Sequence, residues 1–330
     1  MTSRFKVHQA LYYLKIATIL SVSLILGACG GGQGAGSGPK ALPFGNLSLS
    51  VTDAPMDGAT ALVLHFTQVT TVWSGPAGNV LDDYDVIDPG TGQPGYDVDL
   101  LDLTGNKSLA LLDESILASN YPFILLRIDY DLSHIDFEDG SSYKLACTST
   151  RICDTQGRIV LTDGFTVEGN KTLGLVLDFD LRQSVFEPTD TSGNAPYSLE
   201  PVVHVVNADD AGQIIGDVSP GLMVDTDGNL EFDDCYIYVF EGGDALPDDI
   251  MQPASGAHVN PLTTVPVSKN ANGAGNYPYS IDFLPSGTYT LALTCDGKLD
   301  DPRLDDNTIS FPATLNNIGL LPGRTLNRRF

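Results

Sequence analysis

Apolar and polar residues alternate with a period of two in three segments of this chain, at residues 46–52, 123–132 and 173–182. This period gives a strand one buried face and one hydrated face, as is typical of antiparallel sheets. Turn-forming clusters such as Asp88-Pro89-Gly90 separate the segments. Many short strands joined by frequent turns favour β-sandwiches, so we expect a mainly β protein. The one helical signal is short and lies near residues 111–119.

The chain is long enough for two ordinary domains. About 300 residues follow the N-terminal segment, and a domain typically contains about 100–150. The polar stretch 207–212 has the composition of a hinge, because one strand-like apolar run ends before it and another begins after it. We therefore expect two β-sandwich domains in series, at residues 45–207 and 212–330.

The first 28 residues have the composition of a secretory signal. A basic start without acidic residues precedes an apolar run at residues 16–26, and small residues follow. The run is shorter than the roughly 20 residues that a membrane span needs. Residues 26–29, Leu-Gly-Ala-Cys, resemble the lipobox of bacterial lipoproteins. The resemblance implies cleavage before Cys29 and a diacylglycerol on its thiol; the alternative is an ordinary signal peptide with a cysteine there by chance.

Residues 29–44 are expected to form a glycine-rich tether behind the lipidated cysteine. This segment has little apolar area to bury, and a flexible coil of its glycine-rich part has a reach of about 15–20 Å. Such a tether holds a domain off a lipid bilayer. In lipoproteins of this kind, an aspartate after the cysteine tends to retain the protein in the inner membrane. Position 30 is glycine, so the resemblance implies the outer membrane of a Gram-negative cell envelope.

The chain is strongly acidic. It has 42 acidic and 17 basic residues, for a formal charge of −25. Residues 1–28 contain three basic residues and no acidic one, so the mature chain has 14 − 42 = −28. Such a chain repels nucleic acid and anionic headgroups, and we expect no nucleic-acid partner. The charge either attracts cations or keeps the protein soluble.

Four cysteines remain besides the lipidated one, in a compartment that favours disulfides. Four cysteines allow three pairings. Their spacing favours Cys147–Cys153 and Cys235–Cys295, with one bridge in each half of the chain. A zinc site is the alternative, but the close pairs of cysteines typical of such sites are absent from the sequence.

Two acidic segments are candidates for calcium, at residues 225–231 and 296–306. The first places oxygen-bearing residues at alternate positions, as calcium loops do, although Leu230 stands where an EF-hand has its turn glycine. Its alternative is a hairpin turn at Asp227-Gly228. In the second, five carboxylates repel one another unless they are solvated or neutralised. The candidate ligands are Asp225, Asp227, Asn229, Glu231, Asp296, Asp300, Asp301, Asp305 and Asp306.

No catalytic motif is recognisable in the sequence. It has no GxSxG, no HExxH, no phosphate-binding glycine loop and no dinucleotide fingerprint, and no nucleophile with a base beside it. His204 lies in an apolar run and is more typical of a strand residue than of a base. One side of segment 173–182 carries three charged residues, and we expect a charge ladder on a hydrated face there. They are Asp178, Asp180 and Arg182.

Two family resemblances follow from longer motifs. Residues 45–55 resemble the opening signature, and residues 177–185 followed by 199–203 the closing signature, of the bacterial and archaeal domain-of-unknown-function family 4382. This resemblance covers roughly residues 45–207 and implies no activity. Residues 216–218, 236–240 and 283–291 resemble those of a prealbumin-like, carboxypeptidase-regulatory-like sandwich, and this resemblance covers roughly residues 212–330. Such modules are usually accessory and non-catalytic.

The sequence therefore predicts an envelope-anchored, non-enzymatic lipoprotein. It would have two immunoglobulin- or prealbumin-like sandwiches and a binding or structural role, dependent on calcium if the acidic segments bind it. Its partners would be the bilayer, through the lipid on Cys29, and a protein or glycan. The alternative is an enzyme or accessory subunit acting on a cell-surface polymer such as a glycan, which should place two carboxylates about 5–10 Å apart in a cleft.

Overall fold

The computed structural model describes most of the chain beyond the predicted tether. The described residues are 43–54, 56, 58–75, 78–147, 153, 156–188, 195–224, 234–268, 275–305 and 308–330. Cys29, the first acidic segment (225–231) and Asp306 lie outside them. Lipidation and the first calcium loop therefore stay predictions.

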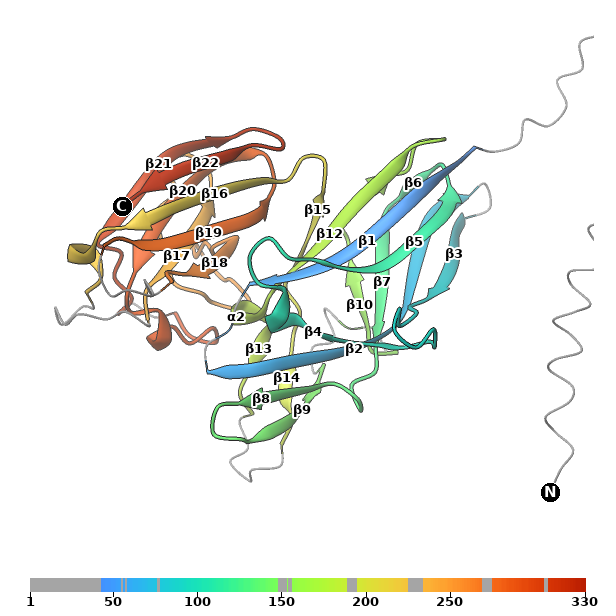
Figure 1. Ribbon diagram of the computed structural model, residues 1–330, viewed down its shortest axis with the longest axis horizontal. Helices are drawn as coiled ribbons and strands as arrows, with labels where there is room; N and C mark the ends of the chain where they lie inside the picture. The colour runs from blue at the N-terminus through green and yellow to red at the C-terminus, as the bar shows by residue number, and fades with distance from the viewer. Residues whose placement is uncertain are drawn as a thin grey trace, which may run out of the picture. The chain divides into compact units, whose positions relative to one another are not determined.

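The first half of the chain forms a sandwich of two sheets (Figure 1). One sheet has four strands, in the order β15 (Val203–Asn207), β12 (Thr172–Asp180), β1 (Phe44–Ala54) and β5 (Leu109–Leu117). The central strand β1 pairs parallel with β12 and antiparallel with β5. Residues 111–119 are thus mostly strand rather than helix, because β5 finds its hydrogen-bond partners in β1.

The facing sheet is built around the 17-residue strand β2 (Ala59–Gly75). Its order is β10 (Arg158–Leu161), β7 (Phe123–Ile128), β2, β8 (His134–Phe137), β9 (Ser142–Ala146), β14 (Tyr197–Leu199) and β13 (Val185–Phe186). β3 (Gly78–Asp85) and β4 (Tyr96–Asp99) also pair with β2. A separate pair joins β6 (Asn120–Tyr121) to β11 (Phe165–Thr166), and a 3-10 turn, η1 (Leu100–Leu103), follows β4.

The alternation of the sequence explains which side chains fill this sandwich. Leu47, Leu49 and Val51 of β1 are fully buried, as the period of two predicts. On the facing sheet, β7 ends at Ile128, four residues short of the predicted segment, and Leu132 beyond it is 54% exposed. Removing a buried leucine of this kind, as in Leu49→Ala, costs about 2–5 kcal/mol.

The second half forms another two-sheet sandwich with its own hydrophobic core, which begins at Ile214. One sheet has the order β19 (Tyr277–Leu284), β16 (Gly212–Val218) and β22 (Thr325–Arg329). The other has the order β18 (Thr263–Pro266), β17 (Tyr236–Glu241), β20 (Gly287–Thr294) and β21 (Ala313–Leu320). Short 3-10 turns follow β16 and β20, at η2 (Pro220–Leu222) and η3 (Gly297–Leu299). The expectation of a mainly β protein with sandwich domains is confirmed.

Strand β17 is buried on both faces. Ile237 and Val239 point into the core of the second sandwich, whereas Tyr238 and Phe240 belong to a second cluster on the outer face of the sheet. Ile250, which is 1% exposed, completes that cluster. The connection between β17 and β18, residues 242–262, thus lies over the outer face of this sheet, and we call it the covering loop.

Both predicted disulfides are confirmed. Cys147 bonds Cys153 within the first sandwich, and Cys235 bonds Cys295 within the second. The second bridge follows from strand pairing: Tyr236 of β17 lies opposite Thr294 of β20, so the residues just outside this pair face each other. Each sandwich is therefore cross-linked within itself.

Candidate functional site

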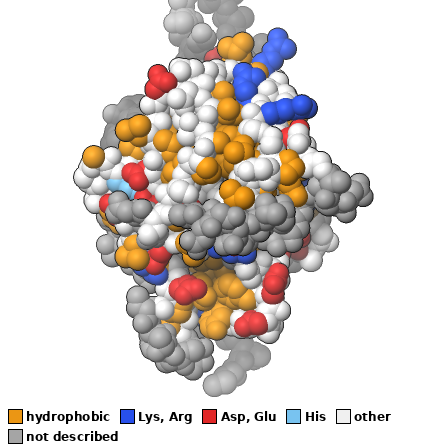
Figure 2. Space-filling view, turned by 90° about the vertical axis from the view of Figure 1, so that its left-hand side faces the viewer, with side chains coloured by type: hydrophobic (Ala, Val, Ile, Leu, Met, Phe, Trp, Pro, Cys, Tyr) orange, Lys and Arg blue, Asp and Glu red, His pale blue; other side chains and the backbone are white. Residues whose placement is uncertain are grey.

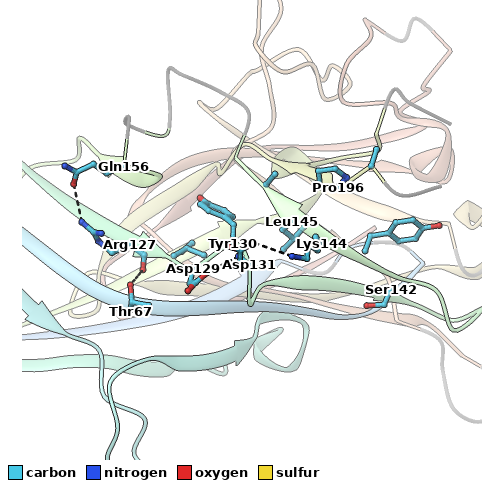
Figure 3. A pocket seen from close by; sticks show the side chains of 14 residues that line it. Thr67, Arg127, Asp129, Tyr130, Asp131, Ser142, Lys144, Leu145, Gln156 and Pro196 are labelled. Carbon is cyan, nitrogen blue, oxygen red and sulfur yellow. Dashed lines mark hydrogen bonds and ion pairs between the residues drawn. The ribbon is translucent and has the colours of Figure 1, made fainter. Parts of the chain in front are cut away.

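A groove of about 860 Å³ opens on the first sandwich, beside the end of β7 and along β9 (Figure 3). Its volume lies in the range of about 300–1,000 Å³ that is usual for ligand sites. Polar side chains supply much of the lining, which includes Thr67, Arg127, Tyr130, Ser142, Lys144 and Gln156. The groove can therefore offer hydrogen bonds from several directions to one ligand.

Two irregularities of the sheet create the groove. A bulge shifts the register between Phe66 and Gln68 of β2, and the Thr67 hydroxyl donates to the Arg127 carbonyl at 3.2 Å. Bulges of this kind re-aim side chains. After β7 the chain leaves the sheet in a turn, where the Asp131 N–H donates to the Asp129 carboxylate at 2.9 Å. The turn raises one wall of the groove.

Two cations from different strands lie in this groove. The Arg127 guanidinium donates from Nη2 to Gln156 Oε1 at 3.2 Å, and its buried Nε–H has no hydrogen-bond partner among the residues that the structure describes. Lys144 Nζ lies 3.3 Å from Asp131, but both side chains are well exposed, so this pair contributes little to stability. Both cations thus retain hydrogen-bonding capacity for a ligand.

Two aromatic residues, Tyr130 and Tyr143, line the groove, and Tyr143 packs against further aromatic rings behind it. The Tyr130 hydroxyl lies 3.5 Å from Cys153 Sγ, and burial raises the pKa of Tyr130, so its phenol stays neutral. Tyr143 lies 5.2 Å from Tyr197 between ring centroids, and Tyr197 lies 5.3 Å from Phe137. Such rigid side chains offer contact area with little loss of conformational entropy.

The prediction that the charged residues at the end of β12 lie on a hydrated face is wrong. Asp180 and Arg182 are only 1% and 8% exposed, so they do not lie on a hydrated face. Asp180 instead caps the short helix α2 (Leu181–Ser184), accepting from the Gln183 N–H at 3.0 Å. The reason is that the second sandwich covers this end of β12.

Arg182 joins the two sandwiches. Its Nη1 donates to Tyr238 Oη at 3.2 Å and to Thr264 Oγ1 at 3.3 Å, and its Nη2 donates to the Gly297 carbonyl. The guanidinium also lies 4.1 Å from the centroid of the Tyr236 ring. All four partners belong to the second sandwich, so we call this set the Arg182 joint.

A smaller cavity of about 250 Å³ lies beside the joint and contains three carboxylates, from Asp53, Asp178 and Asp282. Loss of hydration, followed by repulsion from Asp180 and Asp282, raises the pKa of Asp178 to about 8. Asp282 already accepts from the Ser280 hydroxyl at 2.6 Å. Asp178 is therefore largely uncharged at neutral pH.

Three of the four described members of the second acidic segment have separate hydrogen-bond partners in the protein, and the fourth, Asp305, is exposed. Asp296 accepts from the Ser310 N–H and hydroxyl, at 3.0 and 2.6 Å, and Asp301 accepts from the Arg303 N–H at 3.0 Å. Asp300 accepts from Tyr238 Oη and from the Ile250 N–H. Burial raises the pKa of Asp300 to about 6. Calcium binding by this segment stays a prediction, and Figure 2 shows acidic side chains spread over one face rather than gathered in one patch.

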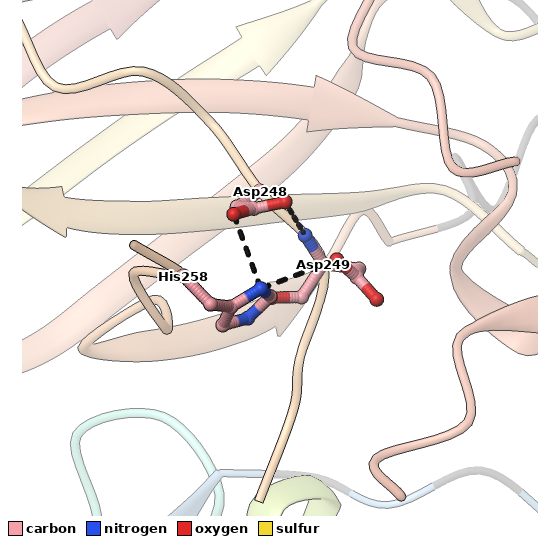
Figure 4. Close-up of side chains that lie close together, drawn as sticks. All are labelled: Asp248, Asp249 and His258. Carbon is pink, nitrogen blue, oxygen red and sulfur yellow. Dashed lines mark hydrogen bonds and ion pairs between the residues drawn. The ribbon is translucent and has the colours of Figure 1, made fainter. Parts of the chain in front are cut away.

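One cluster with metal-ligand chemistry was not predicted. Asp248, Asp249 and His258 of the covering loop bring one ligand atom each to within 4.8 Å of one another (Figure 4). His258 Nδ1 lies 3.1 Å from Asp248 Oδ2 and 3.8 Å from Asp249 Oδ1. The signal available in the sequence was an aspartate pair nine residues before a histidine, and this spacing matches no common metal motif.

Comparisons with known proteins give one match at the level of families. Residues 44–201 match a family model described as “Domain of unknown function (DUF4382)”. A search of the curated proteins finds no match. In the described part of the chain, no helix has the length and apolar character needed to cross a membrane.

The solved structures that this chain matches share little sequence with it. The Bacillus anthracis TIE protein has 10% identity and a TM-score of 0.18, with 87% of this chain and 34% of that chain covered. A “putative cell adhesion protein” of Bacteroides fragilis has 12% identity and a TM-score of 0.21, with 84% and 81% covered. A streptococcal ancillary pilin has 9% identity and a TM-score of 0.17, with 88% and 63% covered. This chain thus spans about a third of the first structure, and at these TM-scores the likenesses carry no argument about function. The conclusion at the level of families is that residues 44–201 match the domain of unknown function DUF4382.

Proposed function

We propose that this chain is an envelope-anchored binding lipoprotein that holds an acidic, hydroxyl-rich polymer, such as a glycan, in the groove of its first sandwich. The lipobox before Cys29 and the glycine-rich residues behind it support the anchor. The groove supports the binding role, because it combines cations, neutral hydrogen-bonding groups and aromatic walls. No catalytic step is part of this proposal.

The presence of two cations from different strands, Arg127 and Lys144, in one groove is the observation that carries the proposal. Each has more N–H donors than its bond to Gln156 or Asp131 uses, so ligand oxygens can be bound at both. A carboxylate or sulfate on the ligand would also form a charge-assisted hydrogen bond with the guanidinium. We therefore expect acidic polymers to bind more tightly than neutral ones.

The net charge of the chain determines which contacts can bind an acidic polymer. The chain as a whole, at −25, repels a polyanion at long range. Binding of an acidic polymer therefore depends on short-range contacts with Arg127 and Lys144. Added salt, which screens the long-range repulsion, should weaken the binding less than it would for a basic protein.

The test is to measure binding of the full chain to matched acidic and neutral polysaccharides by biolayer interferometry. Arg127→Gln should weaken binding of the acidic polymer about tenfold or more. Arg329→Gln is the matched control, because Arg329 is an exposed cation on β22 of the other sandwich, paired with Asp217. Equal binding by both variants would refute the assignment of the groove, and release of shortened polymer would favour the enzyme alternative.

Anchoring is tested separately. Cys29→Ser should abolish labelling by a radioactive or clickable fatty acid in a bacterial host and leave an uncleaved or soluble form. Unchanged membrane association and unchanged mass in this variant would show that the chain is not a lipoprotein.

A further inference from the structure

We propose that Asp248, Asp249 and His258 form a zinc site on the covering loop of the second sandwich (Figure 4). The histidine side chain is 3% exposed, Asp249 is 2% exposed, and the Asp248 side chain is 40% exposed. The site is therefore buried on two sides and reachable from solvent on the third.

The surroundings of the histidine place a proton on one of its two ring nitrogens. Nε2 lies 3.0 Å from the Asp249 carbonyl and 3.1 Å from Asn260 Oδ1. The orientation of the Asn260 amide is fixed, because its Oδ1 accepts from the Met251 N–H at 2.7 Å and its Nδ2 donates to the Met251 carbonyl at 2.8 Å. Nε2 therefore faces two acceptors and must carry a proton.

A neutral imidazole with its proton on Nε2 has its lone pair on Nδ1. That lone pair points at the Asp248 and Asp249 carboxylates. One ligand atom from each of the three side chains then converges on a common centre, where a divalent cation would bind all three. Histidine ligands of metals are usually held in this way, with the other ring N–H donated to a carbonyl or a carboxylate.

The two separations from the histidine suit a small tetrahedral ion. Ligand bonds of about 2.0–2.1 Å, as zinc forms with nitrogen and oxygen, place neighbouring tetrahedral ligands about 3.3–3.4 Å apart. The two separations from His258 Nδ1, at 3.1 and 3.8 Å, bracket this value. A mixed set of imidazole and carboxylate favours zinc over calcium, which prefers oxygen ligands alone. Three protein ligands leave the fourth position open to water or to a group from a partner.

The location suggests what the ion does. The covering loop has no regular secondary structure, and zinc would join its early residues Asp248 and Asp249 to His258 later in the loop. Ile250, next to the site, anchors the loop in the outer cluster and donates its N–H to Asp300. Bound zinc would therefore hold the loop closed over β17 and protect it from proteolysis.

The experiment uses the full chain carrying Cys29→Ser, so that no free thiol competes for the metal. Isothermal titration with zinc, calcium or magnesium at pH 7.5 should show one zinc bound per chain and much weaker binding of the other two ions. Asp248→Asn should weaken zinc binding about tenfold or more, and His258→Gln should abolish it. Zinc should also slow proteolytic cleavage of the covering loop in the chain that retains Asp248, Asp249 and His258.

His134→Gln is the matched control, because His134 is a half-exposed histidine 3.7 Å from a single carboxylate, that of Asp136. It should leave zinc binding unchanged. Asp248 is partly exposed, so its substitution decides the question even if His258→Gln does not fold. Absence of zinc binding, or zinc binding that both Asp248→Asn and His258→Gln leave intact, would overturn the proposal and indicate a protonated histidine paired with two aspartates.

Discussion

Replacing Arg182 with methionine should weaken the contact between the two sandwiches more than any exposed substitution. Methionine fills much of the same volume but removes the charge and the donors to Tyr238, Thr264 and Gly297. It also leaves the buried Asp300 carboxylate, bonded to Tyr238, without its nearby cation. Removing one member of a buried charged network costs about 3–5 kcal/mol, and the lost contact with the Tyr236 ring is part of that cost.

Urea unfolding followed by fluorescence and circular dichroism measures this effect. We expect the Arg182→Met chain to lose about 3–5 kcal/mol in the free energy of unfolding. The two probes should also separate into two transitions, because the sandwiches would unfold independently. Arg329→Gln, which removes an exposed cation, should cost less than about 1 kcal/mol. If both variants stayed within about 1 kcal/mol of the parent, the Arg182 joint would not stabilise the interface.

Three further predictions concern stability. Opening the Cys235–Cys295 bridge, which closes a loop of 60 residues, should lower the free energy of unfolding by about 4 kcal/mol in the chain-entropy model. Opening the Cys147–Cys153 bridge, which closes a loop of six, should lower it by about 2 kcal/mol. Denaturant melts of the two variants with paired serines measure this difference, and equal losses would contradict it. Folding raises the pKa of Asp178 to about 8 and of Asp300 to about 6, above the unfolded value of about 3.9, so the folded state binds more protons. The protonated forms of Asp178 and Asp300 therefore stabilise the folded state fully below about pH 4, and this stabilisation is lost as the pH rises through 6 and 8. The urea midpoint of Asp178→Asn should depend less on pH between 5.5 and 8.5 than that of the parent chain, and an unchanged dependence would exclude this role of Asp178. Calcium should raise the melting temperature more than magnesium at equal ionic strength if the two acidic segments bind it, whereas equal shifts would identify them as solvated turns.

Patterns in the sequence correctly predicted features that depend on residues close together in the chain, such as strand alternation and disulfide pairing. Leu47 and Leu49 are buried because a strand places alternate side chains on one face, and this holds wherever the strand lies in the fold. The disulfides followed from spacing for a similar reason, since each pair lies within one half of the chain. Residues 111–119 were misjudged because their partner strand begins more than 50 residues earlier.

The features that the sequence did not reveal depend on contacts between distant segments. The local sequence around Asp180 and Arg182 is typical of a hydrated surface. These two residues are buried because strand β17 and its tyrosines pack against them. The cluster at His258 depends on the path of an irregular loop, which no periodicity encodes. The groove at Arg127 similarly requires a bulge in one strand and the end of another. The domain boundary at 207–212 and the identity of the ligand stay predictions.

The position of β1 also has a mechanical consequence. If the chain is anchored through Cys29, a pull on the tether enters the fold at Phe44, the first residue of this strand. β1 lies between β12 and β5, so a force along its axis loads both hydrogen-bond ladders in shear, and many bonds must break together. A terminal strand at the edge of a sheet would instead peel away one bond at a time. The fold thus receives a tensile load at a strand that is held on both sides.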